Sequence, residues 1–121
     1  MSDVEAVAHD FCALMVEGRF ADAGDKYWAP NISSIEPADL PEGIPATVSG
    51  IEAVRAKRDH WFGANEIREF LLEGPFVTGN QFAAVIEMLI VPNAGNEPFR
   101  AREVGLFTVQ DGRVTEERYF Y

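Results

Sequence analysis

The second half of the chain constrains the fold most, because four apolar segments there alternate with short turn sequences. The turns are Gly79-Asn80, Asn93-Ala94-Gly95-Asn96 and Asp111-Gly112, and each is typical of a β-hairpin. The segments between them are rich in Val, Ile, Leu and Phe and cover residues 66–78, 81–91, 98–109 and 113–121. We therefore expect four consecutive antiparallel strands.

The first half of the chain shows helical spacing instead. Ser2-Asp3-Val4-Glu5 is a capping box, and apolar residues then recur at three- and four-residue intervals until Gly18. The same spacing predicts a shorter helix over residues 20–28 and a third over residues 51–63. Three helices should precede the strands.

The segment between the second and third helices is the least regular part of the chain. Residues 32–36 predict a short strand, and the proline-rich residues 37–49 predict a loop at the rim of a pocket. No linker or internal repeat divides residues 1–121, so we expect one α+β domain in which three helices pack on a curved, mostly antiparallel sheet.

The charge of the chain excludes several partners. Ten Lys and Arg oppose 20 Asp and Glu, which gives a net charge of −10. Such a chain repels phosphate groups, and its basic residues are scattered, so we expect neither nucleic-acid binding nor attachment to an anionic membrane. The apolar run over residues 82–92 contains Glu87 and is too short to cross a bilayer.

Cysteine and histidine usage points away from disulfide and metal chemistry. The chain has one cysteine, Cys12, and two widely separated histidines, His9 and His60. No internal disulfide is then possible, no zinc or iron spacing is present, and no nucleotide fingerprint is found. We expect a cytoplasmic protein without a metal or other cofactor.

Several short motifs carry a resemblance to a known family. In chain order they are Ser34-Ile35-Glu36-Pro37, Gly50-Ile51-Glu52-Ala53-Val54, Glu73-Gly74-Pro75-Phe76, Glu103-Val104-Gly105-Leu106-Phe107-Thr108-Val109 and Asp111-Gly112-Arg113-Val114. With the order of helices and strands, they resemble the SnoaL-like branch of the nuclear-transport-factor-like superfamily over nearly the whole chain.

The resemblance implies a cone-shaped barrel around a hydrophobic pocket, commonly in a homodimer. The superfamily includes polyketide cyclases, ketosteroid isomerases, limonene epoxide hydrolases, dehydratases and many proteins of unknown activity. Membership therefore implies a pocket and a small-molecule ligand, and it does not select a reaction.

Glu87 is the unusual residue of the apolar strand over residues 81–91. A carboxylate there either faces solvent or forms an ion pair at a dimer interface. Otherwise it lies in a pocket, where it is paired with a basic group or protonated. If the turn over residues 93–97 centres on Gly95, Glu87 lies opposite Glu103. Two acids would then be neighbours in the pocket.

The last hairpin adds a tyrosine to this row. A three-residue loop with a glycine bulge at Asp111-Gly112 places Glu103 opposite Tyr119, with Glu117 and Tyr121 beside it on the same face. A two-residue turn would instead place Phe120 opposite Glu103.

The resemblance also suggests which positions face inward. Aligned with epoxide-hydrolase-like relatives, Glu87, Leu89, Glu103 and Tyr119 fall at concave positions. The residues at the catalytic positions differ from those of the relatives, and Leu89 replaces a catalytic acid. Epoxide hydrolysis by the same mechanism is therefore not expected.

Adjacent carboxylates define the predicted chemistry. Repulsion and burial keep a proton on one of two neighbouring acids, so Glu87 and Glu103 would act as a general acid and a general base. Tyr119 would donate a hydrogen bond to a developing oxyanion. These roles suit isomerisation, cyclisation or dehydration of an apolar carbonyl compound.

Further polar and aromatic residues are candidates for substrate binding. Arg58 lies in the apolar stripe of the third helix and Lys57 on its flank, either at the rim or as counter-ions of the acids. Glu36, before the rim loop, either lines the pocket or forms a salt bridge. Trp28, Trp61 and Phe70 serve as core or as pocket wall.

The sequence leaves two functions open. The chain is either a cofactor-independent isomerase, cyclase or dehydratase, or a binding or scaffold module whose acids are neutralised by Lys57 or Arg58. An inward Glu87 would turn the apolar row Phe82, Ile86, Met88 and Ile90 outward, which predicts a homodimer through the convex sheet face.

Overall fold

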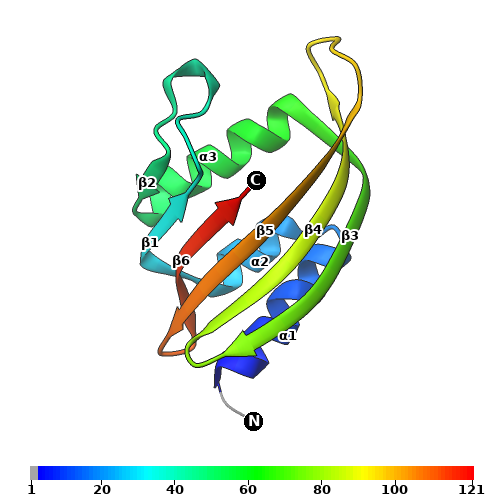
Figure 1. Ribbon diagram of the computed structural model, residues 1–121. Helices are drawn as coiled ribbons and strands as arrows, with labels where there is room; N and C mark the ends of the chain where they lie inside the picture. Colours follow the sequence, from blue (N-terminus) through cyan, green and yellow to red (C-terminus); the bar gives the residue numbers. More distant parts are fainter. Residues whose placement is uncertain (1–2) are drawn as a thin grey trace.

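The computed structural model describes residues 3–121 and has helices and strands in the predicted order (Figure 1). The helices are α1 (Asp3–Val16), α2 (Phe20–Tyr27) and α3 (Ile51–Ala64), with a 3₁₀ turn, η1, at Pro41–Gly43. The strands are β1 (Trp28–Ile35), β2 (Thr47–Ser49), β3 (Asn65–Thr78), β4 (Gln81–Pro92), β5 (Phe99–Gln110) and β6 (Arg113–Phe120). Ser2, the predicted N-cap, lies outside the described residues.

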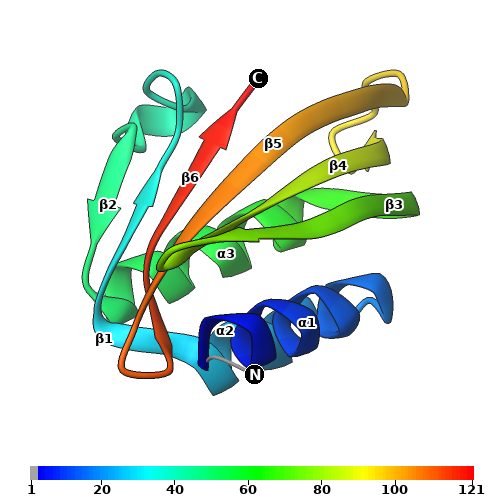
Figure 2. The same ribbon diagram turned by 60° about the horizontal axis from the view of Figure 1, so that its bottom comes forward.

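The strands form one six-stranded sheet in the order β2-β1-β6-β5-β4-β3. Every neighbouring pair is antiparallel except β1 and β6, which are parallel. The sheet is strongly bent, and the three helices lie on its concave side (Figure 2). The predicted α+β class is confirmed, although the sheet stays open and does not close into a barrel.

The segment predicted to be a rim loop contains an additional strand. Residues 47–49 form β2 and pair with β1, where Ser33 lies opposite Ser49. Their hydroxyl oxygens are 3.0 Å apart. A three-residue strand carries too little alternation to be found from sequence, so it was not predicted.

The core lies between α1 and the concave face of β4 and β5. Phe82 and Phe107 are fully buried and stack with their ring centroids 4.8 Å apart. Phe11 of α1 packs against both rings, at 6.0 Å from Phe82 and 5.1 Å from Phe107. The alternating residues of β4 that face these helices are all buried: Phe82, Ala84, Ile86, Met88 and Ile90.

This burial shows that the predicted orientation of β4 is wrong. The row of Phe82, Ile86, Met88 and Ile90 is the core face of the strand and not an outward patch. The pairing of β4 with β5 differs by one residue from the prediction, so Glu87 lies opposite Arg102 and Glu103 lies opposite Ile86. Because side chains alternate along a strand, a slip of one residue moves Glu87 to the convex face.

The last hairpin has a two-residue turn and not the three-residue loop with a glycine bulge. Asp111 and Gly112 adopt φ angles of 52° and 74°, as a tight hairpin turn requires. A bulge at Thr115 then shifts the register, so that Gly105 lies opposite Tyr119. The bulge restores the parity: Glu103 shares the concave face with Tyr119, although the two do not lie opposite each other.

Among the helices of residues 3–121, none is long and apolar enough to cross a membrane.

Candidate functional site

A cavity of about 640 Å³ lies between the concave sheet face and the helices. Its walls are mostly apolar and aromatic, and its charged side chains come from α3, β5 and β6 and from Glu36 and Glu42, which lie between β1 and β2. Ten of the residues predicted for the site line it: Trp28, Glu36, Lys57, Arg58, Trp61, Phe70, Glu103, Glu117, Tyr119 and Tyr121. The strand order explains why these residues meet, since β6 lies between β1 and β5.

Two predicted site residues are not part of this cavity. Glu87 lies on the convex face, where its Oε1 accepts a hydrogen bond from Arg102 Nη1 at 2.9 Å. Leu89 lies on the same face, opposite Arg100. Glu87 and Glu103 therefore do not form the predicted acid pair.

Glu117 is the most deeply buried acid of the cavity, with 6% of its surface exposed. Trp28 Nε1 donates to its Oε1 at 3.1 Å, and Ser34 Oγ donates to its Oε2 at 2.8 Å. Burial raises the pKa of Glu117, and its hydrogen bond from Ser34 and the charge of Lys57 oppose that shift. Glu117 is thus held by two donors and has little freedom to move.

Trp28 reaches Glu117 because α2 lets the indole lie close to its backbone. A Cβ at Gly24 would lie 3.0 Å from the Trp28 ring, so a larger residue there would push against it. On its other side the ring carries the Arg58 guanidinium, 5.3 Å from the ring centroid.

Lys57 connects Glu117 to a second acid. Its Nζ donates to Ser34 Oγ at 2.7 Å and lies 3.4 Å from Glu36 Oε2. Glu36 Oε1 accepts a hydrogen bond from the Tyr121 hydroxyl at 3.0 Å, while Oε2 has an ion pair but no hydrogen bond. Lys57 thus pairs with Glu36, and not with Glu87 or Glu103, the acids for which a counter-ion from α3 was predicted.

Arg58 is not the counter-ion of the cavity acids. It lies 3.2 Å from Asp25 and 3.0 Å from Asp59, both exposed. Its guanidinium is therefore neutralised outside the acid cluster, and its contact with the cavity is the stacking on Trp28.

Glu103 is chemically different from Glu36 and Glu117. Within residues 3–121 its carboxyl group makes no side-chain hydrogen bond or ion pair, and it lines the cavity. Burial, followed by the charges of Glu36 and Glu117, raises the pKa of Glu103 to about 7, although Lys57 opposes the shift. Near neutral pH this group can both accept and donate a proton.

Tyr119 completes the polar part of the cavity. Its hydroxyl interacts with Glu117, and burial together with the charges of Glu117 and Glu103 raises its pKa well above the ordinary value. The phenol therefore remains protonated and can donate a hydrogen bond. Gly105, opposite Tyr119, leaves room for the neighbouring ring, because a Cβ there would lie 2.8 Å from the Phe107 ring.

Sequence reasoning missed the role of Ser34 and much of the apolar wall. Ser34 is fully buried and joins Lys57 to Glu117. The clue was its parity in β1: Ser34 lies beside Glu117, whereas its neighbour Ser33 faces the other side. The missed wall residues are those of β4 that were predicted to face outward, namely Ile86, Met88 and Ile90.

An open, strongly bent sheet that encloses a largely apolar cavity with three helices defines a class of α+β pocket proteins. The match of the chain to a family model narrows this class. The chain belongs to the family of proteins with a SnoaL-like domain, whose model covers residues 2–121.

Solved structures of relatives have the same fold. A Mesorhizobium loti protein proposed to be a SnoaL-like polyketide cyclase is 38% identical, with a TM-score of 0.91 and 100% of each chain covered. A Bacillus subtilis protein proposed to be an isomerase is 19% identical, with a TM-score of 0.78 over 98% of this chain and 88% of that one.

A third similar structure is that of TerC, co-crystallised with polyporic acid. It is 14% identical, with a TM-score of 0.79 over 99% of this chain and 92% of that one. No curated protein matches the sequence significantly.

Proposed function

We propose that this SnoaL-like protein is a cofactor-independent enzyme that moves protons on an apolar carbonyl-type substrate, with Glu103 as the general acid–base group. The single observation that carries the proposal is the environment of Glu103. Its carboxyl group is unpaired, lines a largely apolar cavity and has a pKa raised to about 7. A group that titrates near neutral pH is matched to proton transfer.

The reaction would begin at a carbon next to the substrate carbonyl. The Glu103 carboxylate takes a proton from this carbon, and the electron pair of the broken C–H bond moves to the carbonyl oxygen to form an enolate. The protonated Glu103 then returns its proton to the same carbon, which gives exchange, or to another carbon of a conjugated enolate, which gives isomerisation. In a cyclase, the enolate carbon instead attacks a second carbonyl of the substrate, the π electrons of that carbonyl move to its oxygen, and the protonated Glu103 gives its proton to the resulting alkoxide.

Stabilisation of the enolate oxygen would come from donors that stay protonated. Tyr119 is the first candidate, because its raised pKa keeps the phenol neutral beside Glu117 and Glu103. Lys57 adds positive charge on the side of Glu36 and Ser34. Glu117 is held by Trp28 and Ser34 and serves to orient Tyr119.

A specific observation favours a second candidate function, a non-catalytic ligand-binding module. Three of the four acids that line the cavity are already engaged: Glu36 by Lys57 and Tyr121, Glu117 by Trp28 and Ser34, and Glu42 by His60. Such a network also suits a rigid polar end of a binding pocket. Only Glu103 separates the two functions, so the test is directed at this residue.

The relatives support the proposal at the level of substrate class. A relative with 38% identity is proposed to be a polyketide cyclase, and TerC was crystallised with polyporic acid. The apolar and aromatic walls of the cavity fit a small, largely apolar ligand of comparable kind.

The proposal includes a homodimer through the convex sheet face. The exposed apolar side chains there are Leu71 and Phe76 of β3, Val104 of β5 and Phe120 of β6, not those predicted from sequence. Surfaces of this kind are often buried between subunits.

Proton exchange with deuterated water tests the proposed function without knowledge of the natural substrate. We would incubate β-tetralone, an apolar ketone with an acidic C–H bond, with the protein in D₂O and follow loss of the C–H signal by NMR. The wild type should accelerate exchange, and Glu103→Gln should lower this acceleration by about 100-fold or more.

Glu87→Gln is the matched control, because it makes the same substitution on the convex face and should leave exchange unchanged. Equal exchange rates for wild type and Glu103→Gln, with the ketone bound by both, would contradict catalysis by Glu103 and favour the binding module.

A further inference from the structure

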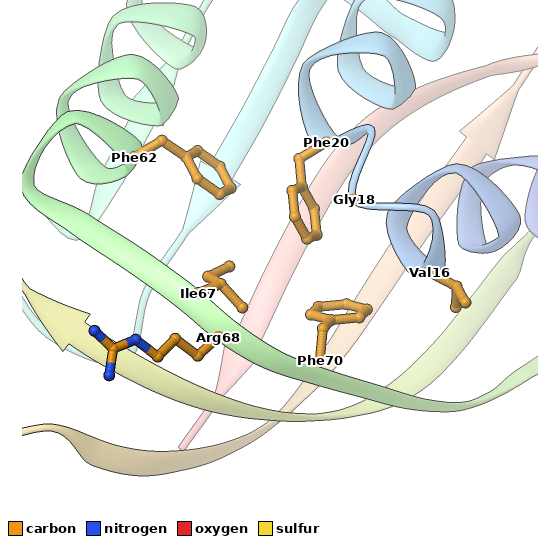
Figure 3. A pocket seen from close by; sticks show the side chains of 7 residues that line it. All are labelled: Val16, Gly18, Phe20, Phe62, Ile67, Arg68 and Phe70. Carbon is orange, nitrogen blue, oxygen red and sulfur yellow. The ribbon is translucent and has the colours of Figure 1, made fainter.

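A smaller apolar pocket of about 340 Å³ adjoins the main cavity at the end of α1. It lies between the α1–α2 turn, the C-terminal end of α3 and the first residues of β3 (Figure 3). We call it the annex; its lining residues are Val16, Gly18, Phe20, Phe62, Ile67, Arg68 and Phe70.

The annex shares part of its wall with the main cavity. Phe20, Phe62, Ile67 and Phe70 line both spaces. The Phe20 ring stacks on Phe62 and meets Phe70 edge-on, with both centroid distances 5.1 Å. Figure 3 shows these rings and Ile67 directed toward one another from α2, α3 and β3. The three rings therefore form the wall that the two spaces share, and Phe20 and Phe70 also pack against the core.

The walls of the annex suit an apolar occupant. Arg68 is its one charged lining residue, and its guanidinium extends away from the rings and lies 3.5 Å from Glu66 (Figure 3). At the outer rim, Val16 and Phe62 are 58% and 38% exposed. Apolar side chains thus remain in contact with water at a concave site, which a ligand would cover.

The register places the annex at a defined distance from Glu103. Glu103 lies opposite Ile86, and Ile86 lies opposite Leu72 of β3. Phe70 is two residues before Leu72 on the same face of β3. Two strand spacings, about 10 Å, therefore separate Glu103 from the strand that carries the annex.

From this shared wall and this distance we infer that the annex binds the apolar tail of an elongated ligand whose carbonyl head lies at Glu103. The position of the head rests on the proposed function, whereas the tail site rests on the annex itself. The ligand class is a carbonyl compound with an acyl chain or ring system long enough to pass Phe70 and reach Val16.

A homologous series of straight-chain methyl ketones, from pentanone to undecanone, tests the tail site. We would measure the Kd of each ketone for the wild type by calorimetry. Each methylene buried in the annex should lower Kd about fourfold, until the chain leaves the outer rim. A Kd that does not depend on chain length, or no binding by any member, would overturn the tail site.

Two variants change the annex in opposite ways at exposed positions. Val16→Trp fills the outer annex and should weaken the longest ketone at least tenfold while leaving the shortest unchanged, because Val16 lines the annex and not the main cavity. Phe62→Ala removes a wall that the two spaces share, so it should weaken the longest ketone more than the shortest. Leu71→Trp, on the convex face of the same sheet, is the matched control and should change neither. Equal losses for short and long ketones, or losses in the control, would contradict the assignment.

Glu103→Gln separates failure of this inference from failure of the proposed function. If Glu103→Gln retains the exchange activity but binding still depends on chain length, the catalytic role is wrong and the tail site stands. If exchange is lost in Glu103→Gln and Kd is independent of chain length, the catalytic role stands and the tail site is wrong.

Discussion

Two glutamates on neighbouring strands, Glu87 of β4 and Glu103 of β5, have opposite surroundings. Glu87 lies on the convex face, 43% exposed at its side chain and paired with Arg102. Glu103 lies on the concave face, unpaired within residues 3–121, with a pKa raised to about 7. The comparison teaches that strand parity, rather than residue type, decides which acid has catalytic potential.

The two faces differ in the same way as the two acids. The helices cover the concave face and exclude water from it. Burying a charged group there costs more free energy, and stability depends on how closely the side chains pack. No helix of residues 3–121 covers the convex face, and charged groups such as Glu87 and Arg102 pair at its surface, where such pairs contribute little.

Aromatic truncation should show the largest difference between the faces. Phe107→Ala removes a fully buried ring that stacks on Phe82 and should lower the free energy of unfolding by about 3–5 kcal/mol. Phe120, on the convex face, is 50% exposed, so Phe120→Ala should cost about 1 kcal/mol or less. Denaturant unfolding measures both, and equal losses would refute the contrast.

The two acids should differ in how stability depends on pH. The pKa of Glu103 is about 7 in the folded chain and 4.5 as the ordinary value. The folded state therefore holds a proton that the unfolded state has released, and this stabilisation is complete below pH 4.5 and is lost as pH rises through 7.

Near pH 8 the folded state must hold a buried, ionised Glu103, which destabilises it. Glu103→Gln removes the ionisable group, so near pH 8 it should raise the free energy of unfolding on the order of 2–3 kcal/mol. The gain should disappear near pH 4. Glu87→Gln is the control and should show no comparable gain. A Glu103→Gln variant that is no more stable than the wild type near pH 8 would argue against a desolvated Glu103.

Two adjacent serines of β1 sharpen the comparison further. Ser34 donates to buried Glu117, so Ser34→Ala should cost about 2 kcal/mol. Ser33 faces the convex side, where its hydroxyl forms an exposed hydrogen bond with the hydroxyl of Ser49. Ser33→Ala should therefore lower the free energy of unfolding by about 0.5 kcal/mol or less. Thermal unfolding of the two variants checks the difference, and similar melting temperatures would contradict it.

A charge on the convex face should have the smallest effect on folding. Phe120→Asp places an acid on the proposed dimer surface and should change monomer stability by about 1 kcal/mol or less. In sedimentation velocity the wild type should be a dimer at micromolar concentration and the variant a monomer. A wild type that sediments as a monomer would disprove the proposed dimer.

The turn chemistry made most of the fold predictable. Gly79-Asn80 and Asp111-Gly112 mark hairpins, and helical spacing locates the three helices, so the α+β class was predicted correctly. The short strand β2 was missed because its pairing with β1, rather than its own sequence, makes it a strand.

The sequence of β4 alone does not show which of its two rows of side chains lies on the concave face. Both of its parity sets are apolar, apart from Glu87, so either face could be buried. The decisive signal lies on β5, where Arg100 and Arg102 alternate with Ala101 and Glu103. Two arginines are harder to bury than one glutamate, and this places Arg102, with its partner Glu87, on the convex face.

The site residues of β5 and β6 could be predicted because the alternation of side chains along these strands was assigned correctly. Glu103, Glu117 and Tyr119 share the cavity because the bulge at Thr115 preserves their common face. The parity of β1 could place Ser34 on the concave face, but its role as a link between Lys57 and Glu117 depends on residues of two other elements and has no local pattern.

Direct titration of Glu103 tests the central claim of a desolvated, unpaired acid. We would follow the ¹³C signal of its side-chain carboxyl by NMR as a function of pH and assign it by its absence in Glu103→Gln. The account predicts a midpoint near 7, as the burial of Glu103 and the charges of Glu36 and Glu117 require. A midpoint near the ordinary value of 4.5 would contradict the proposed acid–base role.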